Sequence, residues 1–89
     1  MSQVIDNEAA GRFELAEQGG TAIAAYQREG DAIVFTHTEV PAELEGEGLG
    51  SRLIAGALQQ VRDAGLKVVP ACSFVAAYVR RHPEAADLA

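Results

Sequence analysis

A glycine-rich segment, VPAELEGEGLGSRL at residues 40–53, stands directly before a run of apolar residues with helical spacing. Its glycines occupy alternate positions, Gly46, Gly48 and Gly50. Glycine permits positive φ angles and lets an anion approach the main chain, while the first turn of a helix offers unpaired N–H groups and partial positive charge. Proteins bind phosphate groups through such backbone arrangements. The pattern is therefore compatible with an anion site on main-chain amides at the start of the helix.

Acidic side chains in the same segment would repel a phosphate group. Glu43, Glu45 and Glu47 are interleaved with the glycines. They leave the site usable if they point outward while the N–H groups point inward, and Arg52, one turn into the helix, could offset their charge. The alternative interpretation is an acidic, glycine-rich turn that only complements the helix dipole.

The better-known glycine motifs do not match this segment. A P-loop requires Gly-Lys-Ser/Thr, whereas Gly50 is followed by Ser51 and Arg52. A dinucleotide-binding G-x-G-x-x-G motif would need a glycine where Ser51 stands. What remains is a strand, a bend containing G-x-G-x-G, and a helix.

The composition describes one small acidic domain, residues 1–89. Hydrophobic residues make up 48% of the chain, which is normal for a folded globule. The net charge of −6 argues against nonspecific nucleic-acid binding, which needs clustered Lys and Arg, and an acidic surface instead gathers cations such as amines or basic peptides.

The chain shows no sign of secretion, membrane insertion or metal binding. Its single cysteine, Cys72, excludes an internal disulfide and fits a reducing compartment. No segment approaches the roughly 20 apolar residues that span a bilayer, and no signal peptide is visible. His and Cys residues lack metal-ligand spacing. We expect a cytoplasmic protein without nucleic-acid or membrane partners.

The first 40 residues predict an antiparallel meander. Residues 12–17, 21–28 and 32–39 have the alternation or the β-branched content of strands, and Glu29-Gly30 has the length of a tight hairpin loop. Strict alternation in the third strand would place Ile33, Phe35, His37 and Glu39 on one face.

The second half predicts helix, strand and helix. Leu49 begins an apolar stripe with helical spacing that runs to Ala64, where Gly65 is suited to end the helix. Gly56 inside this helix predicts close packing on the sheet. Residues 66–69 predict a strand covered on both faces, Ser73 is expected to cap a last helix, and His82-Pro83 to stop it. The order β-β-β-α-β-α predicts an α+β (α/β) fold with a mostly antiparallel sheet and one parallel strand pair.

Three blocks together resemble the minimal, single-domain acetyltransferases of the GNAT superfamily (the YjdJ-type group). They are FTHTEVPAELEGEGLGSRLIAGAL, LKVVPACSFVAAYVRRHPE and the meander before them, and they cover roughly residues 10–88 in order. The resemblance implies that strands 32–39 and 66–69 splay apart and that acetyl-CoA inserts between them.

The resemblance also implies which residues hold acetyl-CoA or CoA. The pyrophosphate would rest on the amides of residues 46–51, the pantetheine arm would run along the end of the strand near Thr38, and Arg81 could meet the CoA phosphates. Superfamily members often have Arg or Gln where Glu45 stands, a departure that concerns cofactor affinity and not the location of the site. The expected cofactor-binding residues are Thr38, Glu39, Val40, Gly46, Glu47, Gly48, Leu49, Gly50, Ser51, Cys72 and Arg81.

Acetyl transfer to an amine needs a base, a polarised carbonyl and a proton for the leaving thiolate. By resemblance, Tyr78 matches the tyrosine that can protonate that thiolate, although its spacing also suits the core. Cys72 falls where the family places the acetyl group, as a lining residue, a transient acyl acceptor or a small buried hydrophobe. His37 and Glu39 could relay the proton of the amine, and Glu39 could attract it; a structural histidine is the alternative.

The resemblance therefore implies an acetyl-CoA-dependent N-acetyltransferase, and we expect direct attack in a ternary complex. The chain lacks the extra helices that form an acceptor pocket in larger relatives, so we expect an exposed peptide or protein amine, or a polyamine, as acceptor. A monomer is favoured, although a partner chain could complete the site. The alternative is a noncatalytic acyl-CoA-binding or interaction module.

Overall fold

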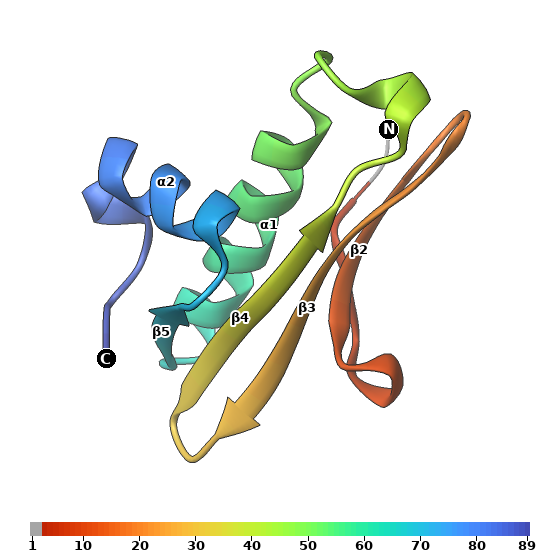
Figure 1. The fold of residues 1–89 in the computed structure, drawn as a ribbon. Helices are drawn as coiled ribbons and strands as arrows, with labels where there is room; N and C mark the ends of the chain where they lie inside the picture. Colours follow the sequence, from red (N-terminus) through yellow and green to blue (C-terminus); the bar gives the residue numbers. More distant parts are fainter. Residues whose placement is uncertain (1–2) are drawn as a thin grey trace.

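The first half of the chain folds as an antiparallel meander, as the sequence predicted. In the computed structural model, which describes residues 3–89, the strands are β1 (Ile5–Asn7), β2 (Arg12–Glu17), β3 (Gly20–Glu29) and β4 (Ala32–Glu39). They lie in the sheet in chain order, followed by β5 (Lys67–Pro70) (Figure 1). The sequence analysis missed β1, a strand of only 3 residues, and the loop between β3 and β4 is Gly30-Asp31, one residue later than predicted.

Helix α1 (Leu49–Asp63) packs its apolar stripe on the meander. Contacts with β3 and β2 dominate, and the predicted stripe is buried from Leu49 to Val61, whereas Ala64 is exposed beyond the helix end. Fully burying a large aliphatic or aromatic side chain contributes about 1.5–3 kcal/mol, so this interface holds the fold together. Its largest fully buried side chains are Phe13, Leu15, Phe35, Leu53, Ile54 and Leu58. Gly65 ends the helix in the left-handed conformation, as predicted.

Gly56 allows close packing, but against a different neighbour from the one expected. A Cβ added there would collide with the side chain of Val4, just before β1. The glycine therefore lets the N-terminal segment, rather than the body of the sheet, approach α1. Gln60 supports the same contact, because its Nε2 donates to the carbonyl of Val4 at 2.7 Å.

A β-bulge in β4 changes which side chains face α1. Phe35 pairs with Tyr26 and His37 pairs with Ala25, so Thr36 has no partner opposite it in β3. Beyond the bulge, Thr38 pairs with Ala24, which is fully buried on the core side. The predicted face containing Phe35, His37 and Glu39 was therefore wrong: Thr38 joins Phe35 on the core side, and His37 and Glu39 turn to the outer side.

Strand β5 pairs with only the first half of β4. The parallel ladder runs from Ala32–Lys67 to Phe35–Pro70 and stops, while β4 continues to Glu39. This confirms the splayed parallel pair. The expectation that β5 is covered on both faces was wrong, because Val68 is buried but Lys67 is exposed.

Helix α2 (Ser73–Arg81) follows β5 and packs against β4, β5 and the start of α1. It buries Val75 and Val79 and ends before Pro83, as predicted. Its N-cap is Cys72 and no side chain caps it, so the capping role expected of Ser73 was wrong. No helix among residues 3–89 has the length and apolar character needed to cross a bilayer.

Candidate functional site

A cavity of about 400 Å³ lies where β4 continues beyond the end of β5. The end of β4, the loop that follows it and the first turn of α1 form its walls, and Phe74 of α2 closes one side. Figure 1 shows this loop at the opposite end of the sheet from the β3–β4 turn. Its lining residues are Thr38, Val40, Leu44, Glu45, Gly46, Gly48, Leu49, Gly50, Ser51 and Phe74.

The start of α1 presents unpaired amides beside this cavity, whereas the N–H of Glu47 in the loop already donates to the carbonyl of Leu44 at 3.4 Å. Gly46 and Gly48 have φ angles of +87° and +77°, which L side chains rarely adopt. Gly48 is the N-cap of α1, and its carbonyl accepts the N–H of Arg52 at 3.0 Å. The N–H groups of residues 49–51 precede this first helical bond, and no side-chain cap occupies the helix start. The local geometry therefore suits an anion.

The glycines of this loop have different functions in the fold. A Cβ at Gly46 or Gly48 would meet nothing within 4 Å. Glycine is therefore required at these two positions by the positive φ angle and not by crowding, and the space beside the main chain is open. A Cβ at Gly50 would stand 2.6 Å from Cζ of Phe74. Gly50 therefore permits α2 to approach α1, a function that the sequence reading did not assign to it.

The acidic side chains of the loop are exposed, as expected for groups that point outward. Glu45 lines the cavity, whereas Glu47 lies in a neighbouring depression with Arg52. Within residues 3–89, Arg52 forms no ion pair with either of them. Its Nη2 instead pairs with Oε2 of Glu17 at 2.8 Å, which ties α1 to the end of β2.

Cys72 connects the splayed elements. Its sulfur lies 3.3 Å from Oγ1 of Thr38, which joins the start of α2 to the end of β4. Burial raises the pKa of the Cys72 thiol, but hydrogen bonds from Thr38 and from the backbone of Val75 and Phe74 outweigh it, so the pKa lies below its ordinary value. A thiol with a lowered pKa has a larger thiolate fraction at neutral pH than a free cysteine.

His37 and Glu39 form an exposed pair on the outer face of β4. His37 Nε2 lies 2.8 Å from Oε2 of Glu39, and both side chains are more than half exposed. They share a face, as predicted. Their pairing gives the outer side of the splay a carboxylate that can attract a cation and an imidazole that can exchange a proton.

The structure brings only part of the predicted site together. Of the expected cofactor-binding residues, Glu39, Glu47, Cys72 and Arg81 do not line the cavity, although Cys72 touches Thr38. Arg81 is exposed in the last turn of α2. Tyr78 is half-buried, and its ring centroid lies 4.5 Å from that of His82.

The sequence reading missed Leu44 and Phe74 as lining residues. Leu44 lies in a short 3₁₀ turn (Ala42–Leu44), which has no periodic pattern to reveal it. Phe74, in the first turn of α2, is 38% exposed and turns its ring to Gly50. Among residues 3–89, no three His, Cys, Asp or Glu side chains lie close enough to hold a metal ion.

Comparisons with known proteins agree with this architecture. The family model described as GCN5-related N-acetyl-transferase matches residues 12–88. A solution NMR structure from Staphylococcus aureus, of a GCN5-like protein described provisionally as an N-acetyltransferase, is similar at 24% identity with a TM-score of 0.70. The match covers 93% of this chain and 82% of that one, which shows the shared fold. The comparison with curated proteins gives no significant match.

The resemblance inferred from the sequence is thus confirmed by an independent match over nearly the whole chain. The matched range contains the splayed strands, the glycine loop and both helices. The chain belongs to the GCN5-related N-acetyltransferases, a family of acyl-transferring enzymes.

Proposed function

We propose that this protein binds acetyl-CoA in the cavity beside the splayed strands and transfers the acetyl group to an amine by direct attack in a ternary complex. The observation that carries this proposal is the open, uncapped start of α1, where Gly46 and Gly48 adopt left-handed conformations beside empty space. Such a main-chain surface fits a diphosphate, because it offers N–H donors and the positive end of a helix dipole.

Different residues in and near the cavity would bind different parts of the cofactor. The amides of residues 46–51, apart from that of Glu47, which is bonded to the carbonyl of Leu44, would hold the pyrophosphate. The main chain from Thr38 to Val40 would lie along the pantetheine arm. Arg81, which stands apart from the cavity, would reach only the distal phosphates. Bound acetyl-CoA supplies an activated acetyl thioester.

The protein's own groups then position the amine and move protons. Glu39 attracts a cationic amine to the outer side of the splay, and His37, bonded to Glu39, is placed to accept its proton. Cys72 and Tyr78 are the candidate proton donors on the other side. Direct attack needs no acyl-enzyme, so we assign Cys72 to the lining of the acyl end, held there by Thr38.

The acceptor is proposed to be an exposed amine on a peptide or protein, or a polyamine. His37 and Glu39 are exposed, so a bulky acceptor can reach them. The net charge of −6 favours a cationic partner. We further propose that the protein works in the cytoplasm as a monomer, where a thiol of lowered pKa stays reduced.

A noncatalytic acyl-CoA-binding module is the second candidate. Glu45 is the charged side chain that lines the cavity, and Arg52 is committed to Glu17. A protein that only binds acyl-CoA would keep the main-chain anion site at the start of α1 but would not need a strong base.

Two measurements separate these functions. Calorimetry with acetyl-CoA should show binding in either case, and absence of binding would exclude both. Release of CoA thiol with a panel of lysine peptides and polyamines should then depend on the amine. Binding without amine-dependent thiol release would support the noncatalytic module instead. An enzyme with a His37→Gln substitution should bind acetyl-CoA normally and release thiol more slowly.

A further inference from the structure

A second and larger cavity lies at the other end of α1. Its volume is about 470 Å³, and its walls come from β1, β2, β3, β4 and the last turns of α1. Val61, which lines it, is 11 positions after Gly50 of the first cavity. A helix rises 1.5 Å per residue, so the two cavities are separated by roughly 16 Å along the helix axis. The glycine loop and Cys72 do not contribute to it.

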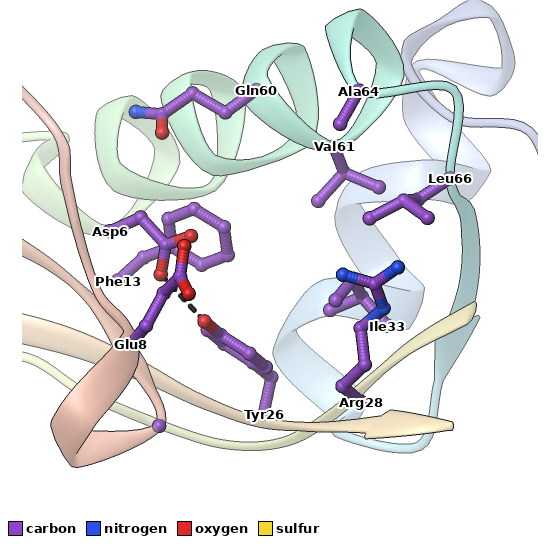
Figure 2. Close-up of a pocket in the computed structure, with 11 residues that line it drawn as sticks. Asp6, Glu8, Phe13, Tyr26, Arg28, Ile33, Gln60, Val61, Ala64 and Leu66 are labelled. Carbon is purple, nitrogen blue, oxygen red and sulfur yellow. Dashed lines mark hydrogen bonds between the residues drawn. The ribbon is translucent and has the colours of Figure 1, made fainter. Parts of the chain in front are cut away.

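One side of this cavity is acidic. The hydroxyl of Tyr26 donates a hydrogen bond to Oδ1 of Asp6 at 2.6 Å, and Figure 2 shows the carboxylate of Glu8 beside them. Burial, followed by the hydrogen bond and charge of Asp6 and the charge of Glu8, raises the pKa of Tyr26. The phenol therefore stays neutral and holds Asp6 as an acceptor. Two carboxylates placed together favour a bound ammonium group.

The other side of the cavity carries a cation, the guanidinium of Arg28. Arg28 donates from Nε to the carbonyl of Gly30 at 2.9 Å, which anchors its stem. No ion pair within residues 3–89 includes Arg28. In Figure 2 its guanidinium points into the cavity from the side opposite Asp6 and Glu8. The two terminal nitrogens are thus available to bind a carboxylate in a bidentate manner.

Apolar groups lie between the two charged sides. Phe13, Ile33 and Val61 are all less than 5% exposed and form the floor of the cavity, and Leu66 closes its rim. A pocket with an apolar floor and a few convergent polar groups is the usual form of a small-molecule site. Because the charged groups face each other across Tyr26, a ligand with charges at opposite ends fits better than one with both charges on a single carbon.

We propose that this cavity binds a small apolar zwitterion, such as a free dipeptide, with its ammonium group at Asp6 and Glu8 and its carboxylate at Arg28. The site is separate from the acyl-transfer site and does not depend on the function proposed for that site.

An amide NMR titration with leucyl-leucine, in the absence of acetyl-CoA, tests this proposal. The expected result is saturable shifts at residues that line the cavity, with the amides of residues 46–51 unchanged. Capping either end of the dipeptide, by N-acetylation or by C-terminal amidation, should each weaken binding by roughly tenfold or more, since a charge-assisted hydrogen bond contributes about 1.5–3 kcal/mol. Equal binding of the capped and free forms, an absence of shifts, or shifts confined to residues 46–51 would overturn the proposal.

Two arginine variants test whether the carboxylate end of the dipeptide binds at Arg28. Arg28→Gln should weaken binding of the free dipeptide by roughly tenfold but leave binding of the C-terminal amide unchanged, because only the carboxylate contacts Arg28. The control is Arg80→Gln, an exposed arginine on α2 that does not line this cavity. If the Arg28→Gln and Arg80→Gln variants behave alike, the carboxylate does not bind at Arg28 and the proposal is wrong.

Discussion

Thr38 and Cys72 are joined by a contact of 3.3 Å between hydroxyl and sulfur, at the point where β4 and the chain after β5 have separated. The β-bulge at Thr36 makes this contact possible, because it turns Thr38 to the same side as the core residue Phe35. The backbone of Phe74 and Val75 adds donors to the same sulfur. Thr38 therefore bridges the splay through polar contacts of its side chain and its backbone with Cys72, beside the glycine loop.

The pH dependence of Cys72 alkylation should report the contact between Thr38 and the thiol. Because the thiol pKa is lowered, alkylation by iodoacetamide should reach half its maximal rate at a pH below about 8.5, the value for a free cysteine. Thr38→Val removes one donor to the sulfur and should move the midpoint upward. Thr21→Val, an exposed threonine on β3, is the control and should leave the midpoint unchanged. An unshifted midpoint in Thr38→Val would show that the hydroxyl does not stabilise the thiolate.

The same shift makes stability depend on pH. The folded pKa of Cys72 lies below the unfolded value, so the folded state binds fewer protons at this group. Its contribution to the free energy of unfolding should therefore rise with pH between the folded pKa and the unfolded pKa of about 8.5, and be lost as pH falls through the folded pKa. Urea unfolding of the wild type and of Cys72→Ala across this range should give a difference that grows with pH; a flat difference would contradict the lowered pKa.

Removal of the thiol tests the order of chemical steps. Cys72→Ala should retain measurable acetyl transfer, because direct attack by the amine requires no acyl-enzyme. The assay is CoA release with the best amine found, together with calorimetry to establish that acetyl-CoA still binds. Complete loss of transfer with binding and fold intact would identify Cys72 as an acyl acceptor.

The glycines of the loop should respond differently to substitution. Gly50→Ala places a methyl group against the ring of Phe74 and should lower the free energy of unfolding by about 1–3 kcal/mol, the usual cost of overpacking. The double variant Gly50→Ala/Phe74→Leu should recover much of this loss. Urea unfolding measures both. Failure of the second change to restore stability would show that the ring is not what Gly50 accommodates.

Gly48 is expected to affect binding more than folding. Gly48→Val should weaken acetyl-CoA binding strongly, but it also carries backbone strain of about 1–2 kcal/mol at φ +77°. Gly48→Asn is the sharper variant, because asparagine tolerates this conformation. It should reduce affinity by roughly tenfold, or about 1.4 kcal/mol, while changing the free energy of unfolding less than that. Equal losses of stability and affinity would favour a purely structural glycine.

The acidic lining of the cavity predicts an increase in affinity on neutralisation. Glu45 lines the cavity and should repel a diphosphate, so Glu45→Gln should strengthen acetyl-CoA binding several-fold, most clearly at low salt. Glu43→Gln, an exposed neighbour that does not line the cavity, is the matched control. Calorimetry at two ionic strengths compares them. Identical affinities for both variants would mean that the phosphate groups bind away from Glu45.

The features that sequence reasoning predicted well are long and periodic. The stripe of α1 from Leu49 to Val61 repeats over several turns, and the strand residues before it carry β-branched and aromatic side chains. Glycine at positions 46 and 48 indicated left-handed backbone because few other residues adopt it comfortably. These signals are local, so they can be read without knowledge of the fold.

The features that were missed depend on contacts between distant residues. The bulge at Thr36 reverses the faces of His37 and Glu39, yet one extra residue leaves no mark in the composition of β4. In the sequence, Gly50 looks like the other two glycines of the loop. Its packing function is visible only in the fold, where the ring of Phe74 from α2 lies against it. Arg52 is close to the glutamates along the chain, whereas its ion-pair partner, Glu17, is on a distant strand.

The central claim is that main-chain amides at the start of α1 hold the diphosphate of the cofactor. An amide NMR titration with CoA tests it most directly, because each N–H group of the loop reports separately. The account predicts that the amides of residues 48–51 show the largest shifts and saturate together. Saturation accompanied by unchanged amides in that stretch, with the shifts elsewhere in the molecule, would contradict it.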